Sequence, residues 1–265
     1  GRVYGAKGAI ITDDDYLLCD VSREFRHYKS SIIHKYSVLK KIFLGRVKNI
    51  KGNVAVITSD GYDNYFHFLF DILPRLELLK KADLINEIDY FIFPPKKNIE
   101  KLELNNELEY ILKVLKISKN KLIFSNNDHF HIKADNLFVP SLPSYLGQTS
   151  KMSIDFIRKY FLKNNLKKND YDYIYITRKH ARNRKIKNEN QLLEILKSYG
   201  FKNLICEHKT TFEKAAIFNS AKCVISMHGA GLTNLVFCQK ECIVLNLFSS
   251  SYVDPNFWIL SNNLE

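Results

Sequence analysis

The second half of the sequence alternates between short apolar runs and amphipathic stretches. The apolar runs are residues 171–178, 203–207, 223–228 and 242–248, and their length is that of buried strands. The stretches between them have the length of helices, which parallel strands need as crossover connections. One of these helices is predicted to end in Gly200 as a C-cap, and the next to begin with a threonine cap and to carry Glu213 in its first turn. The alternation therefore predicts an α/β domain with a parallel sheet and helices on both of its faces.

The first half is less regular and predicts a second α/β domain. Residues 65–81 predict one helix that is kinked or restarted at Pro74, because proline lacks the N–H that a helix interior uses. Residues 141–150 are loop-like, so we expect two domains, at residues 1–148 and 149–265. The other expected elements are short strands and turns before residue 50 with a hairpin at 8–20, strands at 52–59, 89–95 and 121–125, a helix at 105–116, and a pair of extended segments within 130–141.

Composition narrows the class of protein. Of the 265 residues, 46% are hydrophobic, which is enough for ordinary cores in one or two domains. The five cysteines form no Cys-x-x-Cys pair, so we expect neither a disulfide framework nor a zinc site, and we infer a reducing compartment. We see no signal peptide and no apolar run near the ~20 residues of a membrane span, so we expect a cytoplasmic protein.

The formal net charge of +12 has several explanations. A Lys-rich solvated surface would account for it, and so would an anionic ligand, an anionic membrane or nucleic acid. The basic residues are not gathered on one helix and no nucleic-acid-binding motif is present, so we expect no nucleic-acid partner. Peripheral contact with the inner face of an anionic plasma membrane stays open.

The strongest local signal is the segment SMHGAGLTNLVF, residues 226–237. A buried strand is predicted to end before a small-residue turn, and a helix is predicted to begin after it. Small residues let a ligand approach the backbone, and the N–H groups of a helix start favour phosphate. In an open parallel sheet, ligands bind beyond the carboxyl ends of strands, where this turn lies.

A tight turn without a ligand would explain Gly-Ala-Gly alone. His228 favours binding, because a polar ring before the glycines has no evident packing duty. The pattern is neither a Walker loop nor the dinucleotide fingerprint, which speaks against ATPases and NAD enzymes. The phosphate-binding candidates are His228, Gly229, Ala230, Gly231, Thr233 and Asn234.

A second signal is the basic loop at residues 176–189. Arg178 directly follows a predicted buried strand, and a guanidinium group at a strand end suits phosphate oxygens. Arg182 is a further binding candidate, and Arg184 and Lys185 are secondary ones, since a solvated loop would also explain them. Glu189 would orient this loop or cap the helix that follows.

A third signal lies in the apolar segment NYFHFLFDILPRL, residues 64–76. His67 and Asp71 are four residues apart and therefore share one face of a helix that is otherwise apolar. Polar groups in such a helix pair with each other or face a cleft, so the pair is either structural or a base with its orienting carboxylate. Asn64 and Arg75 are secondary candidates.

These three segments together resemble glycosyltransferase family 61, over about residues 52–248. The family includes bacterial capsule enzymes, plant xylosyl- and arabinosyltransferases and animal O-GlcNAc transferases. The resemblance implies a GT-B-like fold, with two doubly wound Rossmann-like domains that face a cleft. It implies donor binding by the C-terminal domain, acceptor binding by the N-terminal domain, inversion at the anomeric carbon, and no obligatory metal. Family members often carry Glu-Gln before the HGAG turn, where this chain has Glu213 and Lys214, and Glu213 is a secondary donor candidate.

The resulting hypothesis is a transferase of capsular or surface-polysaccharide synthesis that moves a sugar from a nucleotide-sugar to a glycan or lipid-linked glycan hydroxyl. The nucleotide-sugar is a substrate, and we expect no cofactor and no metal, because the acidic run 13–15 sits in a predicted hairpin turn.

Arg178, the HGAG turn and Arg182 would stabilise the leaving diphosphate. His67 oriented by Asp71 is the preferred base, and direct assistance by Asp71 is the alternative. A non-catalytic nucleotide-sugar-binding domain and, after it, a nucleic-acid-binding protein are the rival classes.

Overall fold

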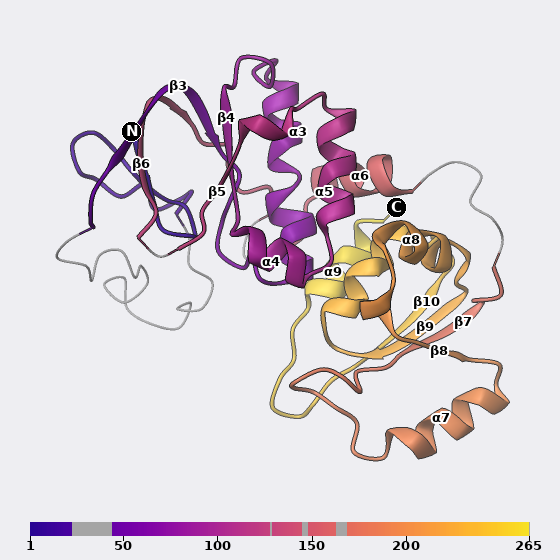
Figure 1. Ribbon diagram of the computed structural model, residues 1–265. Helices are drawn as coiled ribbons and strands as arrows, with labels where there is room; N and C mark the ends of the chain where they lie inside the picture. The colour runs from indigo at the N-terminus through magenta and orange to yellow at the C-terminus, as the bar shows by residue number, and fades with distance from the viewer. Residues whose placement is uncertain (23–43, 128, 145–147, 163–168, 265) are drawn as a thin grey trace. The chain divides into compact units, whose positions relative to one another are not determined.

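The computed structural model describes residues 1–22, 44–127, 129–144, 148–162 and 169–264 (Figure 1). The chain divides into two compact units, Gly1–Leu146 and Gly147–Glu265, and each has its own sheet. Both units are mixed α/β structures that contain parallel strands, which agrees with the α/β class expected from the sequence, and in the first unit β1 pairs antiparallel with β2 and β6. Within the described residues, no helix is both long and apolar enough to cross a bilayer.

The first unit is built on a six-stranded sheet of order β2-β1-β6-β3-β4-β5. β3 pairs in parallel with β6 on one side and with β4 on the other, and β5 extends the sheet in parallel beyond β4. Because β3 is central, Val54, Ala55 and Val56 at its end are fully buried. The strands are β1 (Arg2–Tyr4), β2 (Ala9–Ile11), β3 (Lys48–Val56), β4 (Tyr90–Phe93), β5 (Leu122–Phe124) and β6 (His131–Phe138).

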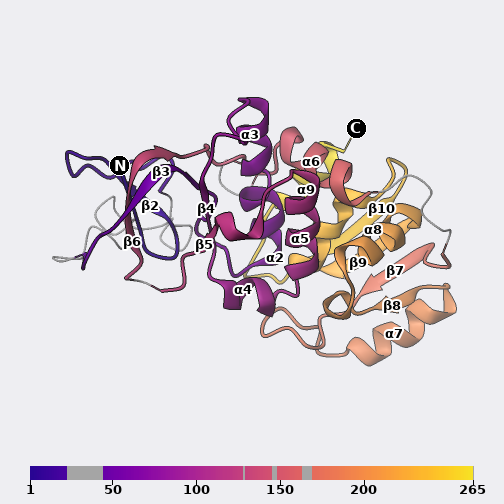
Figure 2. The same cartoon turned by 45° about the horizontal axis from the view of Figure 1, so that its top comes forward.

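The helices of this unit cluster beside the parallel strands. α3 and α5 lie side by side next to β4 and β5 (Figures 1 and 2). The helical segments are α2 (Tyr65–His67), the π-helix η3 (Phe68–Ile72), α3 (Arg75–Lys81), α4 (Lys96–Lys101), α5 (Asn105–Val114) and the 3-10 turn η4 (Lys119–Lys121).

The helix expected over residues 65–81 is divided into three parts. The restart at Pro74 is confirmed, and α3 begins at Arg75. The π-helical turn between α2 and Pro74 was not expected: the N–H of Leu73 bonds to the carbonyl of Phe68, five residues earlier. Such single π turns are rare and occur often at functional sites. His67 and Asp71 lie in the first two of these parts.

Other expectations for the first unit need correction. Residues 130–141 contain one long strand, β6, and not a pair of extended segments, because β6 pairs with β1 and β3 along its length. The strand expected at 52–59 starts earlier, at Lys48, and ends at Val56. The hairpin at 8–20 is present, but its second arm is reduced to a bridge between Ile11 and Leu17. Residues 23–43, for which we expected strands and turns, lie outside the described residues.

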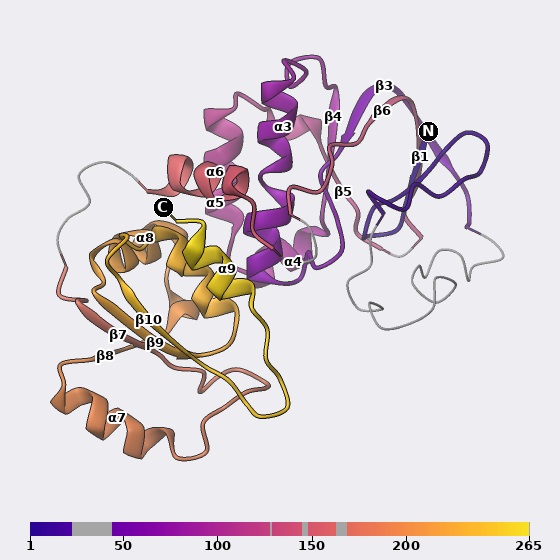
Figure 3. The same cartoon turned by 180° about the vertical axis from the view of Figure 1, so that it is seen from behind.

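The second unit has the alternating order that the sequence predicts. All four strands are parallel, in the order β10-β9-β7-β8. The chain passes from β7 outward to β8 and then back across to β9, so the crossover helices fall on opposite faces. Accordingly α7 lies on one side of the sheet and α8 and α9 on the other (Figures 1 and 3). The strands are β7 (Tyr173–Ile176), β8 (Lys202–Leu204), β9 (Cys223–Met227) and β10 (Ile243–Leu247).

Local helix signals in this unit are confirmed. α8 starts with the expected cap: the Thr210 side chain accepts from the N–H of Glu213, and the Glu213 side chain accepts from the N–H of Thr210. Gly200 follows α7 with a left-handed φ of +80°, as expected for a glycine stop. The helical segments are α6 (Lys151–Phe161), α7 (Glu189–Ser198), the 3-10 turn η5 (Cys206–His208), α8 (Thr211–Ser220), the 3-10 helix η6 (Ala230–Phe237) and α9 (Asn256–Asn262).

The helix expected after the HGAG turn is present, but its type and its first residue differ from the expectation. It is the eight-residue 3-10 helix η6, and it begins at Ala230 within the turn and not at Leu232. Every side chain from Leu232 to Phe237 is fully buried, and η6 packs against α6, α8 and α9. A segment that is buried on all sides takes the backbone form that its neighbours allow, and periodicity in the sequence cannot reveal that form.

Candidate functional site

The candidate residues fall into two clusters, one in each unit. In the first unit, the cluster begins with the loop after β3. Gly61 in this loop has a left-handed φ of +79°, and a Cβ atom there would lie 2.7 Å from the ring of His67. Glycine is therefore required twice, for its backbone conformation and for the close approach of the loop to His67. Asn64 caps α2, since its side chain accepts from the N–H of Phe66.

His67 and Asp71 form the expected pair. Their Nδ1 and Oδ2 atoms are 2.6 Å apart, and the side chain of Asp71 is 1% exposed while that of His67 is 21% exposed. A carboxylate accepts hydrogen bonds, so Nδ1 carries the proton and the basic lone pair of the neutral ring is on Nε2. A buried carboxylate behind a partly exposed imidazole is the arrangement of a general base with its orienting group.

Arg75 supports this pair from within the fold. It is fully buried and donates from Nη1 to the carbonyl of Thr58 (2.7 Å) and from Nε to the carbonyl of Pro140 (3.0 Å). Burial lowers its pKa to about 10, and the charge of Asp71 opposes that shift. Arg75, a secondary site candidate from the sequence, thus ties the loop after β3 to the segment after β6.

Sequence reasoning missed Ser144. Its hydroxyl donates to Oδ1 of Asp71, although the two residues are 73 positions apart. Ser144 is 8% exposed and lies in a segment that the sequence marks only as a loop. No local pattern could have indicated it, because the contact exists only once the segment after β6 passes the π-helical turn.

In the second unit, the cluster lies where β7 and β9 are neighbours. β8 lies on one side of β7 and β9 on the other, so their carboxyl ends form the switch point at which ligands of such sheets bind. Arg178 follows β7 and the HGAG turn follows β9. A Cβ atom on Gly229 would lie 1.6 Å from Nη1 of Arg178, so a residue with a side chain would displace this guanidinium from its place against the turn.

Arg178 also organises the basic loop. Its Nε donates to the carbonyl of Arg184 (3.2 Å) and its Nη2 donates to the carbonyl of Asn183 (3.1 Å). Its Nη1, which lies against Gly229, makes no hydrogen bond to the part of the chain that is described. Burial, together with the charge of Arg184, lowers the pKa of Arg178. An arginine stays protonated at neutral pH, so a half-buried cation lies at the switch point.

Arg184, a secondary candidate from the sequence, has an unusual backbone and a close aromatic neighbour. Its backbone is left-handed, with φ of +57°, which is uncommon for a residue with a side chain. Its guanidinium lies 4.8 Å from the centre of the Tyr252 ring, a cation–π contact. Arg182 and Lys185 are exposed on the same loop.

Glu189 fixes the end of β7 to the start of α7. Its Oε1 accepts from the hydroxyl groups of Tyr175 (2.7 Å) and Thr177 (2.8 Å). Burial and this carboxylate raise the pKa of Tyr175. These bonds reach the residue just before Arg178 and not the loop itself, so a role of Glu189 in orienting the loop stays a prediction. The N-cap position of α7 is occupied by Asn188.

The sequence argument for His228 was wrong in one respect, because this ring has a clear packing role. It is 5% exposed and lies among three aromatic rings, stacked on Phe248 at 5.2 Å and 4.9 Å from Phe257, with Tyr252 at its edge. Burial, followed by the charges of Arg184 and Arg178, lowers its pKa, while Asp254 opposes the shift. The ring is therefore neutral at neutral pH.

The remaining candidates around the turn have internal partners or internal positions. Thr233 and Asn234 are fully buried, and the Asn234 amide donates to the carbonyl of Gly231 (2.9 Å). Both side chains therefore lie inside the unit, where the bond from Asn234 stabilises the turn. Glu213 accepts from the N–H and hydroxyl of Thr210, and these bonds lower its pKa. Ala230 and Gly231 begin η6, and a Cβ on Gly231 would lie 3.0 Å from Ile176.

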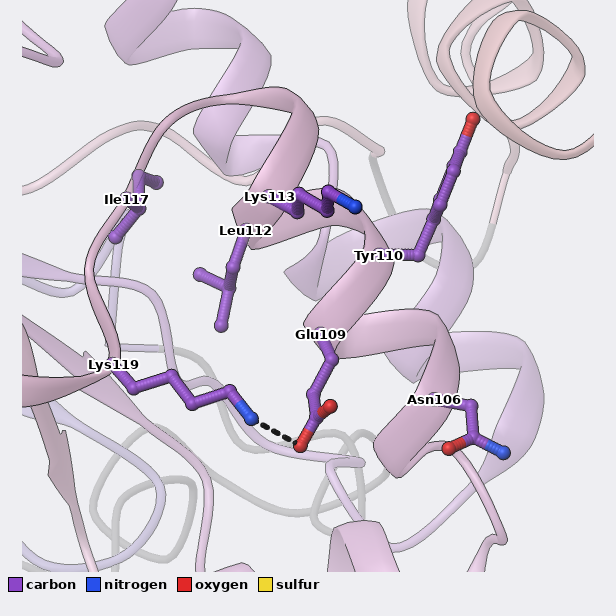
Figure 4. Close-up of a pocket in the computed structure, with 7 residues that line it drawn as sticks. All are labelled: Asn106, Glu109, Tyr110, Leu112, Lys113, Ile117 and Lys119. Atoms are coloured by element: carbon purple, nitrogen blue, oxygen red, sulfur yellow. Dashed lines mark ion pairs between the residues drawn. The ribbon is translucent and has the colours of Figure 1, made fainter.

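A hollow of about 460 Å³ lies elsewhere, beside α5 (Figure 4). The ion pair between Glu109 and Lys119, 2.6 Å apart, crosses it. None of the candidate residues lines this hollow, so its volume does not mark the site. Over the described residues, no group of three or more His, Cys, Asp and Glu side chains is placed to hold a metal ion.

Comparison with known families decides the class of protein. The model of the family Glycosyltransferase 61 matches residues 65–245, which is more than half of the chain. The chain belongs to glycosyltransferase family 61. The resemblance inferred from the three motifs is thus confirmed, and the protein is a glycosyltransferase with sugar donor and acceptor substrates. The matched region of this family 61 chain contains His67, Asp71, Arg178 and the HGAG turn. Comparison with curated proteins gives no match.

Proposed function

We propose that this family 61 enzyme transfers a sugar from a nucleotide-sugar to a glycan hydroxyl, with inversion and without an obligatory metal. The observation that carries the proposal is the guanidinium of Arg178 lying on Gly229 at the switch point between β7 and β9. A cation and the backbone of a small-residue turn meet there, which is the chemistry that a diphosphate requires.

The leaving nucleotide carries developing negative charge on its diphosphate. Arg178 supplies one cation at the switch point, and Arg184, held above Tyr252, and the exposed Arg182 supply others. The N–H groups of the HGAG turn add fixed dipoles. Charges and dipoles that are held in place before reaction stabilise a transition state without reorganisation, so no resident cofactor is needed for the chemistry proposed.

His67 is the general base in this proposal. It removes the proton of the acceptor hydroxyl while that oxygen attacks the anomeric carbon from the face opposite the leaving group. The sequence left open whether Asp71 acts directly. The burial of Asp71 supports His67, since the carboxylate is 1% exposed behind an imidazole that is 21% exposed.

The arrangement and cellular role follow from the family resemblance. We propose a GT-B-like enzyme in which residues 1–148 bind the acceptor and residues 149–265 bind the donor. Its substrates would be used in capsular or surface-polysaccharide synthesis at the inner face of the plasma membrane. The net charge of +12 supports contact with anionic lipid, where lipid-linked acceptors are presented.

A thermal-shift screen tests the donor proposal. A nucleotide-sugar that binds the native state raises the apparent Tm, by an amount that grows with ligand concentration over Kd. We expect one nucleotide class, as sugar conjugate and as free diphosphate, to raise the Tm of the native chain and to raise that of Arg178→Ala much less. A panel in which no nucleotide stabilises the protein, or stabilises both proteins equally, contradicts the donor site.

A further inference from the structure

Ser144 completes a chain of hydrogen bonds that runs through Asp71 to His67. The Ser144 hydroxyl donates to Oδ1 of Asp71, and His67 Nδ1 bonds to Oδ2 of the same carboxylate at 2.6 Å. We propose that Ser144 is a positioning residue of the transfer reaction, which holds Asp71 in the orientation that keeps His67 in its basic tautomer. This inference rests on the proposed role of His67 as base.

The order of the three groups determines what Ser144 can do. In hydrolases with a serine nucleophile, the serine hydroxyl bonds to the imidazole, and the carboxylate lies on the far side of the ring. Here the hydroxyl bonds to the carboxylate, and the imidazole bonds to the other oxygen. Ser144 is therefore placed behind Asp71 and not next to the nitrogen that accepts a proton.

Burial makes the hydroxyl important. Asp71 is 0% exposed, and a buried carboxylate oxygen without a donor is costly. The terminal torsion of an aspartate is soft, so its hydrogen bonds fix the rotation of the carboxylate and keep one oxygen directed at His67. With Ser144 on Oδ1, Oδ2 is directed at Nδ1 and favours the proton there, which leaves Nε2 as the base.

The segment that carries Ser144 is itself fastened at two points. Arg75 donates from Nε to the carbonyl of Pro140, and Asp71 accepts from Ser144. Asp71 and Arg75 are one helical turn apart, on either side of Pro74. The same short stretch of helix therefore holds both ends of the segment, and the position of the hydroxyl is set by the fold.

The first test measures the tautomer of His67 by NMR and needs no substrate. The full chain is labelled with ¹⁵N-histidine, and long-range ¹H–¹⁵N spectra report the tautomer of each ring, with His67→Ala to assign the signal. We expect protonated Nδ1 in the native chain and in Ser144→Thr, which keeps a hydroxyl. In Ser144→Ala we expect the tautomer with the proton on Nδ1 to be less populated. Ser141→Ala removes an exposed serine three residues earlier and should change nothing.

The second test uses turnover of the nucleotide-sugar that gives the largest thermal shift. Ser144→Ala should lower kcat about tenfold, the lower end of what an outer partner of a functional group contributes, with the donor Kd unchanged. In an Asp71→Asn background the same change should lower kcat no further, because Ser144 acts through Asp71.

The outcomes separate this inference from the proposed function. If Ser144→Ala lowers the Tm but leaves the His67 signals and kcat unchanged, Ser144 is only structural and the inference is overturned. If His67→Ala itself retains full turnover, the assignment of the base fails, whatever Ser144 does to the spectrum. If His67→Ala is inactive and Ser144→Ala matches the native chain in both tests, the base stands and Ser144 is rejected.

Discussion

The two clusters are built by different means. In the first unit, side chains hold side chains: Ser144 bonds to Asp71, and Asp71 bonds to His67. In the second unit, the missing side chain of Gly229 lets Arg178 lie on the backbone of the turn. The difference matches the tasks proposed for them. A base needs one nitrogen held in one protonation state, whereas a diphosphate needs cations and N–H groups brought close together.

If the two clusters have these different tasks, substitutions in the cluster of the first unit should reduce turnover the most. His67→Ala and Asp71→Asn should each lower kcat by ~10²-fold or more, the usual contribution of a positioned base. Donor affinity should hardly change, since the donor groups proposed here lie in the second unit. The double variant should be little worse than either single one. Steady-state kinetics and melting curves on the same preparations check this: variants that melt early yet keep full specific activity would make the pair structural.

Removing the cation of the second unit should instead act on binding. Arg178→Ala should weaken nucleotide binding by about 1.5–3 kcal/mol, the contribution of a charge-assisted contact. Titration calorimetry measures it, with Lys197→Ala as the control, since Lys197 is an exposed cation in the last turn of α7 and is not a donor-site candidate. Equal affinity in folded Arg178→Ala and the native chain would remove Arg178 from the donor site.

A pair of glycine variants tests the close approach itself. Gly229→Ala should displace Arg178 and weaken nucleotide binding, since the added Cβ would lie 1.6 Å from Nη1. Gly200→Ala has no atom nearer than 3.9 Å to its Cβ, but its φ of +80° is strained for alanine. It should cost about 1 kcal/mol of stability and leave binding intact. If the two variants bind nucleotide equally well, whether as tightly as the native chain or more weakly, the contact between Gly229 and Arg178 does not contribute to binding.

The smallest expected effect is that of chelation. Excess EDTA should leave turnover unchanged, because arginines and backbone N–H groups are proposed to stabilise the diphosphate. The measurement is donor turnover with and without EDTA, followed by added manganese or magnesium. Loss on chelation with recovery on adding metal would show that the second unit works through a cation it does not itself supply.

Patterns in the sequence determined the secondary structure of the second unit and several local contacts. The alternation of apolar and amphipathic runs gave the parallel sheet of the second unit, and proline chemistry placed the restart at Pro74. The spacing of His67 and Asp71 predicted their contact, and Thr210 with Glu213 predicted a helix cap. The restart, the His67–Asp71 contact and the helix cap each rest on residues within one or two turns of one another, so the local backbone suffices to bring them together.

Only the tertiary structure decided the rest. Three contacts join residues that are far apart in the chain. They are the hydrogen bond from Ser144 to Asp71, the contact of Arg178 with Gly229 and the packing of His228 against aromatic rings. They depend on which strands become neighbours and on which side chains fill the space between layers. The 3-10 form of η6 has the same origin, since burial on every side overrode the helix that its sequence predicts. Periodicity encodes which face of a segment is buried, but the partner it meets there is fixed only when the whole chain packs.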